Sequence, residues 1–313
     1  AAKRNGKIVS RETLLYKTND GVPSHMMEAI AGAIQRRAKD VGEKPQALAG
    51  VGVSVAGMVD PLLGVVQGLT NRRGWEVVPV ARILEDRLGV PVFADNNVRA
   101  AALHDQWFGS RAGEGGVVYL YVGEGVGGAY IDDQGLLRGV HNTAGFFGHM
   151  TIEPDGPVCS CGSRGCLEIL ASDIAFIHSV WPDRVQGASD LTFSERSEMV
   201  KEGIEKARLG DLRAARALVA VARYVGIAVA NIVAALDPRT VYIYGTMTDI
   251  AQDHIVDLIR REAMQRIWPD ARGVEIKALT NYEEFLLRGA IGLVLSRTYR
   301  VLREQVHAVS MAR

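Results

Sequence analysis

Three cysteines and a histidine lie within one short stretch of this sequence and form a candidate metal site. Cys159, Cys161 and Cys166 are the only cysteines of the chain, and His149 lies ten residues before the first of them. Three thiolates and one imidazole are ligands typical of structural zinc sites, which have closed tetrahedral shells. Soft sulfur ligands favour zinc over magnesium or calcium. The sequence therefore predicts one structural Zn²⁺ bound by these four side chains.

Two alternatives for this cluster are incidental free thiols, or one disulfide with a thiol left over. Cys159 and Cys161 are too close in sequence to pair comfortably, and the N-terminal residues do not resemble a signal peptide. Gly162 and Gly165 allow the tight turns that let such closely spaced ligands converge. We therefore favour a metal site in a reduced, cytoplasmic setting.

A closed four-ligand site leaves no position for a reactive water, so the metal is expected to order the chain around it. Glu168 lies two residues after the last cysteine. Its carboxylate, and the ring nitrogen of His149 that does not bind the metal, are candidates for binding a hydroxyl-rich molecule.

The elements that must position these residues follow an α/β pattern. Short apolar runs predict buried strands at residues 48–56, 90–94, 117–122 and 240–244. Helical spacing predicts helices at 23–41, 77–88, 98–107, over most of 171–268, and from Glu283 to about Val306. A hairpin is expected at 1–17, turning at Asn5-Gly6. Residues 211–235 are rich in Ala and Val on nearly every side, so this helix is expected to be buried all round.

The length and charge of the chain limit what it can do. At 313 residues it can form two lobes, each with its own core. Its 36 basic and 36 acidic residues cancel, which counts against direct binding of nucleic acid or an anionic membrane. No apolar run reaches the ~20 residues needed to cross a bilayer, so we expect a soluble protein.

Two polar residues near the ends of predicted elements are further candidates. Asp95 follows the strand at 90–94, at the position where ligands bind in open α/β sheets. Its alternative role is the N-cap of the next helix. Asn71 lies in the segment 68–75, where its alternative role is that of a turn residue.

The string G-H, followed ten residues later by C-x-C-G-x-x-G-C-L-E, resembles the zinc signature of the ROK family of sugar-responsive repressors and sugar kinases. The resemblance implies that His149 both binds zinc and faces the sugar, and that Glu168 contacts sugar hydroxyls. Asp95 and Asn97 resemble the family's N-D-x-N, although Ala94 replaces its first Asn. In kinases this Asp is the general base. Asn71 resembles the Asn of N-L-x-W, which binds a hydroxyl.

The same resemblance implies an α/β fold of the two-lobed, actin-like (ribonuclease-H-like) sugar kinase type, with a ligand cleft between the lobes. The first lobe is expected at 1–108, completed by the C-terminal helix at about 285–313. The second, at 109–284, would carry the zinc and the dimer interface.

Several positions depart from the pattern of the family's kinases. Glu124, in the glycine-rich stretch 123–128, replaces a Thr that helps to hold ATP, and a carboxylate there would repel a triphosphate. Thr246 and Met247 replace two glycines of a loop that lies against adenosine. Phe146 replaces a sugar-binding Glu, and would either pack in the core or stack on a sugar ring. The opening D-x-G-G-T phosphate loop is not found in these residues.

These departures favour the effector-binding, dimerising part of a ROK-type transcriptional regulator that binds a small sugar. Its partners would be a second copy, as a homodimer or dimer of dimers, and DNA only through a helix-turn-helix head preceding residue 1. The alternative is an ATP-dependent sugar kinase of the glucokinase or N-acetylhexosamine kinase type, with Mg²⁺ and with Asp95 as the base. A third possibility is a degenerate family member that serves as an interaction module.

Overall fold

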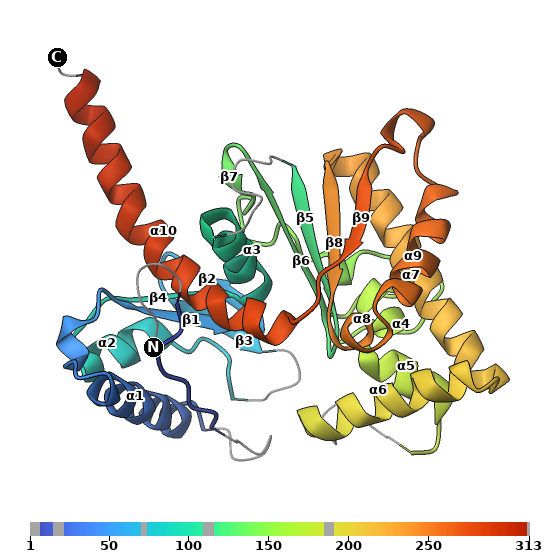
Figure 1. Ribbon diagram of the computed structural model, residues 1–313, viewed down its shortest axis with the longest axis horizontal. Helices are drawn as coiled ribbons and strands as arrows, with labels where there is room; N and C mark the ends of the chain where they lie inside the picture. Colours follow the sequence, from blue (N-terminus) through green and yellow to red (C-terminus); the bar gives the residue numbers. More distant parts are fainter. Residues whose placement is uncertain (1–6, 15–21, 70–73, 109–115, 185–190, 312–313) are drawn as a thin grey trace. The chain divides into compact units, whose positions relative to one another are not determined.

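The structure is a computed structural model, and it describes residues 7–14, 22–69, 74–108, 116–184 and 191–311. The chain divides into two compact units (Figure 1). Unit 1 comprises residues 1–112 and 283–313, and unit 2 comprises residues 113–282. Each unit has its own hydrophobic core.

Unit 1 is an α/β unit with two pairs of strands. Its elements are α1 (Pro23–Asp40), η1 (Pro45–Ala47), β1 (Val51–Val55), β2 (Gly57–Asp60), β3 (Val65–Leu69), α2 (Val80–Leu88), β4 (Val92–Asn96), α3 (Asn97–Phe108) and α10 (Tyr282–Met311). Strands β1 and β4 are parallel, with Ser54 opposite Asp95, and β2 and β3 are antiparallel. Asp95 therefore lies near the carboxyl end of a parallel pair.

Local chemistry sets the ends of α2. The helix begins three residues later than predicted, because Val78 forms a β-bridge with Val66 and Val77 has a φ of 58°. Gly89, at a φ of 68°, ends the helix in the left-handed conformation that glycine adopts without strain. The predicted turn at Asn5-Gly6 lies outside the described residues.

Unit 2 is built on a five-stranded sheet with the order β7-β6-β5-β8-β9. Its elements are β5 (Val117–Val122), β6 (Val126–Asp132), β7 (Gly135–Leu136), η2 (Phe147–His149), α4 (Leu167–Ala171), α5 (Asp173–Val180), α6 (Phe193–Arg208), α7 (Leu212–Leu236), β8 (Thr240–Tyr244), α8 (Thr246–Ala251), α9 (Asp253–Met264), η4 (Pro269–Ala271) and β9 (Glu275–Ala278). Strands β5, β8 and β9 run parallel, and β6 is antiparallel to β5. Val118, Leu120 and Val122 of β5 share one core with the helices on this face of the sheet (Figure 1).

Helix α7 is the central helix of this core. By length and composition alone it could cross a membrane, but 61% of its most apolar window is buried within the protein. The prediction that it is buried all round is wrong, since Leu212 and Val219 are 71% and 50% exposed. These two residues lie seven positions apart and therefore share one face of the helix.

Candidate functional site

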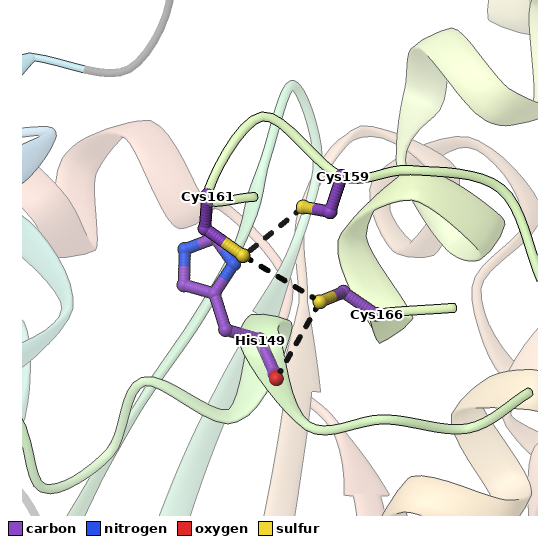
Figure 2. A group of neighbouring side chains, drawn as sticks. All are labelled: His149, Cys159, Cys161 and Cys166. Atoms are coloured by element: carbon purple, nitrogen blue, oxygen red, sulfur yellow. Dashed lines mark hydrogen bonds between the residues drawn. The ribbon is translucent and has the colours of Figure 1, made fainter. Parts of the chain in front are cut away.

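The four predicted metal ligands converge in unit 2 (Figure 2). Their ligand atoms all lie within 4.8 Å of one another. The sulfur atoms of Cys161 and Cys166 are 3.7 Å apart, and Cys159 Sγ is 3.8 Å from His149 Nδ1. Tetrahedral zinc, with bonds of about 2.0–2.3 Å, separates its ligand atoms by roughly 3.5–3.8 Å. All three cysteines are free, so the disulfide alternative is not formed, and the donor set fits one zinc ion.

Backbone hydrogen bonds shape the loop that carries the thiols. The amide of Cys159 donates to the carbonyl of Ser163 at 2.8 Å, and the amide of Gly162 donates to the carbonyl of Cys159 at 2.9 Å. Cys166 is the N-cap of α4, and His149 ends η2. The ligands are thus held by a tight turn and by the ends of two short helical segments.

The electrostatics of the thiols differ within the cluster. Burial raises the pKa of the Cys166 thiol to about 12, while a backbone hydrogen bond from Ser163 lowers the pKa of Cys161. A bound metal cation deprotonates coordinating thiols and neutralises their charge. The cluster therefore has the chemistry of a metal shell.

Two glycines of this loop provide a matched test of its geometry. Gly165 (φ 58°) and Gly162 (φ 90°) both have left-handed backbones, so alanine at either position adds strain of about 1–2 kcal/mol. A Cβ atom at Gly165 would also collide with the carbonyl oxygen of Glu153, whereas one at Gly162 meets nothing within 4 Å. We expect Gly165→Ala to lose most of its bound metal and Gly162→Ala to retain it, measured as metal per purified chain. Equal metal contents in the two variants would contradict this geometry.

Glu168 lies in α4, two residues after Cys166, and contacts the start of β6. Its Oε2 accepts a hydrogen bond from the amide of Val126 at 2.9 Å. A Cβ atom at Gly148 would collide with the carbonyl oxygen of the same Val126. The first residue of β6 therefore contacts both Glu168 and the residue that precedes His149, which brings the two predicted ligand-binding residues of unit 2 together.

Phe146 lies beside His149, one of the four candidate metal ligands. Its side chain is half-buried. The rings of Phe146 and His149 are in an edge-to-face contact, with 6.5 Å between the ring centroids and 70° between the ring planes. Phe147 packs against the core of unit 2 instead. Phe146 is therefore not one of the residues described in the core of unit 2.

Asp95 lies in β4 and does not cap α3. Asn96 does so, because its Oδ1 accepts hydrogen bonds from the amides of Val98 at 3.0 Å and Arg99 at 3.4 Å. Asp95 is fully buried, and its Oδ1 lies 3.8 Å from Nη1 of Arg99, which is 1% exposed. The guanidinium offsets the cost of burying the carboxylate. Asn71 lies outside the described residues.

Sequence reasoning missed a second charged cluster, in unit 2. Arg196 of α6 lies 2.9 Å from the carboxylate of Glu124 and 3.7 Å from that of Asp173. Asp173 also accepts a hydrogen bond from the hydroxyl of Thr246 at 2.7 Å. Burial raises the pKa of Asp173 to about 7. Arg196 is one of several charged residues in a polar helix, so nothing in the sequence marks it as buried.

The fold and the family match define the class of protein. The architecture is the two-lobed actin-like α/β fold of ROK sugar kinases, as expected. Residues 1–296 match the ROK family, so the chain belongs to this family.

Relatives of the chain include both regulators and enzymes. The xylose repressor of Caldicellulosiruptor bescii is 30% identical over 295 residues, which cover 93% of this chain and 73% of the repressor. The glucokinase of Thermotoga maritima is 30% identical over 301 residues, covering 94% of this chain and 92% of the kinase. The crystal structure of a Streptomyces griseus ROK glucokinase with glucose and AMPPNP aligns with a TM-score of 0.73 at 25% identity, covering 92% of this chain and 93% of that chain.

Proposed function

We propose that this chain is the sugar-sensing effector domain of a ROK-type transcriptional regulator. The observation that carries the proposal is the carboxylate of Glu124 in the glycine-rich loop after β5, paired with Arg196 at 2.9 Å. Phosphoryl transfer depends on neutralising the charge of the phosphates, and a carboxylate in such a loop opposes this. The test is an assay of phosphoryl transfer, whose expected result is no turnover with a sugar that binds.

The proposed ligand is a small carbohydrate, and its proposed contacts are Asn71, Asp95, His149 and Glu168. Support comes from the chemistry of these side chains, which donate to or accept from hydroxyl groups. The names of the relatives also support a sugar ligand, since they refer to xylose and glucose. The Cys₃His cluster consists of His149, Cys159, Cys161 and Cys166. A structural Zn²⁺ bound to it would fix the positions of His149 and of the start of α4, which carries Glu168.

Sugar binding should raise the melting temperature of the protein. We expect one member of a panel of pentoses, hexoses and N-acetylhexosamines, with xylose and glucose included, to give a shift at millimolar concentration. Glu168→Gln and Asp95→Asn should weaken binding of that sugar about tenfold or more, because each loses a charged acceptor. Glu198→Gln is the control, since Glu198 is 72% exposed on α6. The proposed site is wrong if no sugar gives a shift, or if Glu168→Gln binds as tightly as the parent chain.

An ATP-dependent sugar kinase is the second candidate, and Asp95 is the observation that favours it. Its place near the carboxyl end of β4 suits a general base that takes the proton of a sugar hydroxyl. In that case Mg²⁺ and ATP would be the cofactors.

We also propose partners for the regulator. The exposed apolar side chains of Leu212 and Val219 on α7, with Leu209 just before it, are suited to contact with a second copy in a homodimer or dimer of dimers. DNA would be bound by a helix-turn-helix head that is not part of these 313 residues. Three free cysteines in one loop fit a reduced, cytoplasmic setting.

A further inference from the structure

Two connections of unit 2 lie at the carboxyl ends of neighbouring parallel strands: residues 123–125 between β5 and β6, and Gly245, which leads directly into α8. Strands β5 and β8 pair in parallel with Tyr121 opposite Tyr244, and each is followed at once by glycine. A Cβ atom at Gly245 would collide with the carbonyl oxygen of Val122, so the two connections start in direct contact. This edge of a parallel sheet is where α/β proteins bind ligands, and backbone amides of glycine-rich turns bind anions.

A buried cation lies at this edge. The side chain of Arg196 is only 4% exposed, and its Nη2 and Nε face the carboxylates of Glu124 and Asp173, respectively. Asp173 is hydrogen-bonded to both segments, because its amide donates to the carbonyl of Gly123 at 2.7 Å and its carboxylate accepts from Thr246, the first residue of α8. A buried guanidinium must have an anionic partner, and here the loop itself supplies one.

The two carboxylates differ in how they are held. Asp173 is fully buried, and it is fixed at the start of α5. Glu124 is 42% exposed, and Arg196 is the partner described for its side chain. Glu124 is therefore the member of the cluster that another anion could replace. Arginine is the side chain best suited to bind phosphate oxygens, so the anion that Arg196 would accept is a phosphate group.

We infer that Glu124 is a built-in anion that occupies Arg196 and makes this edge of the sheet reject phosphate-bearing ligands. The ion pair is then a specificity determinant, which excludes nucleoside triphosphates and inorganic polyphosphates from a regulator that binds an uncharged sugar. This inference rests on the proposed function. It also implies that one substitution at Glu124 uncovers a phosphate site.

The test is binding of inorganic triphosphate, measured by calorimetry at constant ionic strength. The proteins are the full 313-residue chain with its metal, Glu124→Gln, Glu124→Thr, and Glu202→Gln as a control. Glu202 forms an exposed ion pair with Arg184 in the same unit, so Glu202→Gln changes the net charge equally. We expect Glu124→Gln and Glu124→Thr to bind at least tenfold more tightly than the parent chain, and Glu202→Gln to bind like the parent.

The double variant Glu124→Gln, Arg196→Met should lose the gained binding. The inference is overturned if Glu124→Gln binds no more tightly than Glu202→Gln, or if the parent chain binds triphosphate as well as Glu124→Gln does. If the double variant does not fold, the comparison of the two Glu124 variants with Glu202→Gln decides alone. A parent chain that phosphorylates sugar would refute the proposed function. A catalytically silent parent whose Glu124 variants gain no triphosphate binding would refute this inference alone.

Discussion

Cys161→Ser is expected to purify with almost no bound metal and to unfold at a clearly lower temperature than the parent chain. The parent should contain one zinc ion per chain, because the ligand atoms of the Cys₃His cluster already lie within 4.8 Å of one another. Serine is a poor ligand for zinc, and the remaining three ligands cannot close a tetrahedral shell. A structural site contributes its binding energy to folding, so we expect a loss on the order of 3 kcal/mol or more.

For a domain of the size of unit 2, each kcal/mol lost from the free energy of unfolding lowers the melting temperature by about 2–4 °C. The melting temperature should therefore fall by roughly 6–12 °C. Ser160→Ala is the control, because Ser160 is an exposed neighbour in the same loop. Metal content is measured by elemental analysis of protein purified with a reductant and without chelator. Parent protein that contains almost no zinc under these conditions would refute the metal site. So would Cys161→Ser protein that retains as much zinc as Ser160→Ala.

The second large effect is the expected absence of phosphoryl transfer, tested with the sugar that the chain is found to bind. Glu124 and Arg196 pair with each other, and the buried side chains of Thr246 and Met247 follow β8 where glycines would let a backbone approach a nucleotide. Each missing electrostatic contact costs about 10²–10³ in rate, so together they should leave turnover far below ~1 s⁻¹. Asp95 would then serve as a hydroxyl acceptor in ligand sensing.

A coupled assay of ADP release measures this, on the full-length protein with Mg²⁺ and ATP. A ROK glucokinase assayed under the same conditions shows that the coupling enzymes respond. Asp95→Asn identifies any residual turnover that belongs to the chain itself. Turnover above about 1 s⁻¹ that disappears in Asp95→Asn would restore the kinase interpretation.

The sequence by itself determined the cluster of candidate metal ligands and most of the regular elements. Four side chains of metal-binding type within 18 residues are brought together locally, because the turns at Gly162 and Gly165 control their positions. Strand β5 begins and ends at the predicted residues, since its apolar run is bounded by glycines on both sides. Signals of this kind are local, so they can be read without knowing the fold.

Tertiary structure decided which charged residues form ion pairs and which helix faces are buried. Arg196 and Glu124 are 72 positions apart, and the packing of α6 against α5 and α8 buries the guanidinium beside the carboxylate. Similarly, Asn96 rather than Asp95 caps α3, because β4 extends through Asp95 and turns that side chain toward Arg99. The composition of α7 suggests burial on all sides, yet Val219 is half exposed. Burial depends on which neighbours a residue meets in space, and a one-dimensional pattern does not contain them.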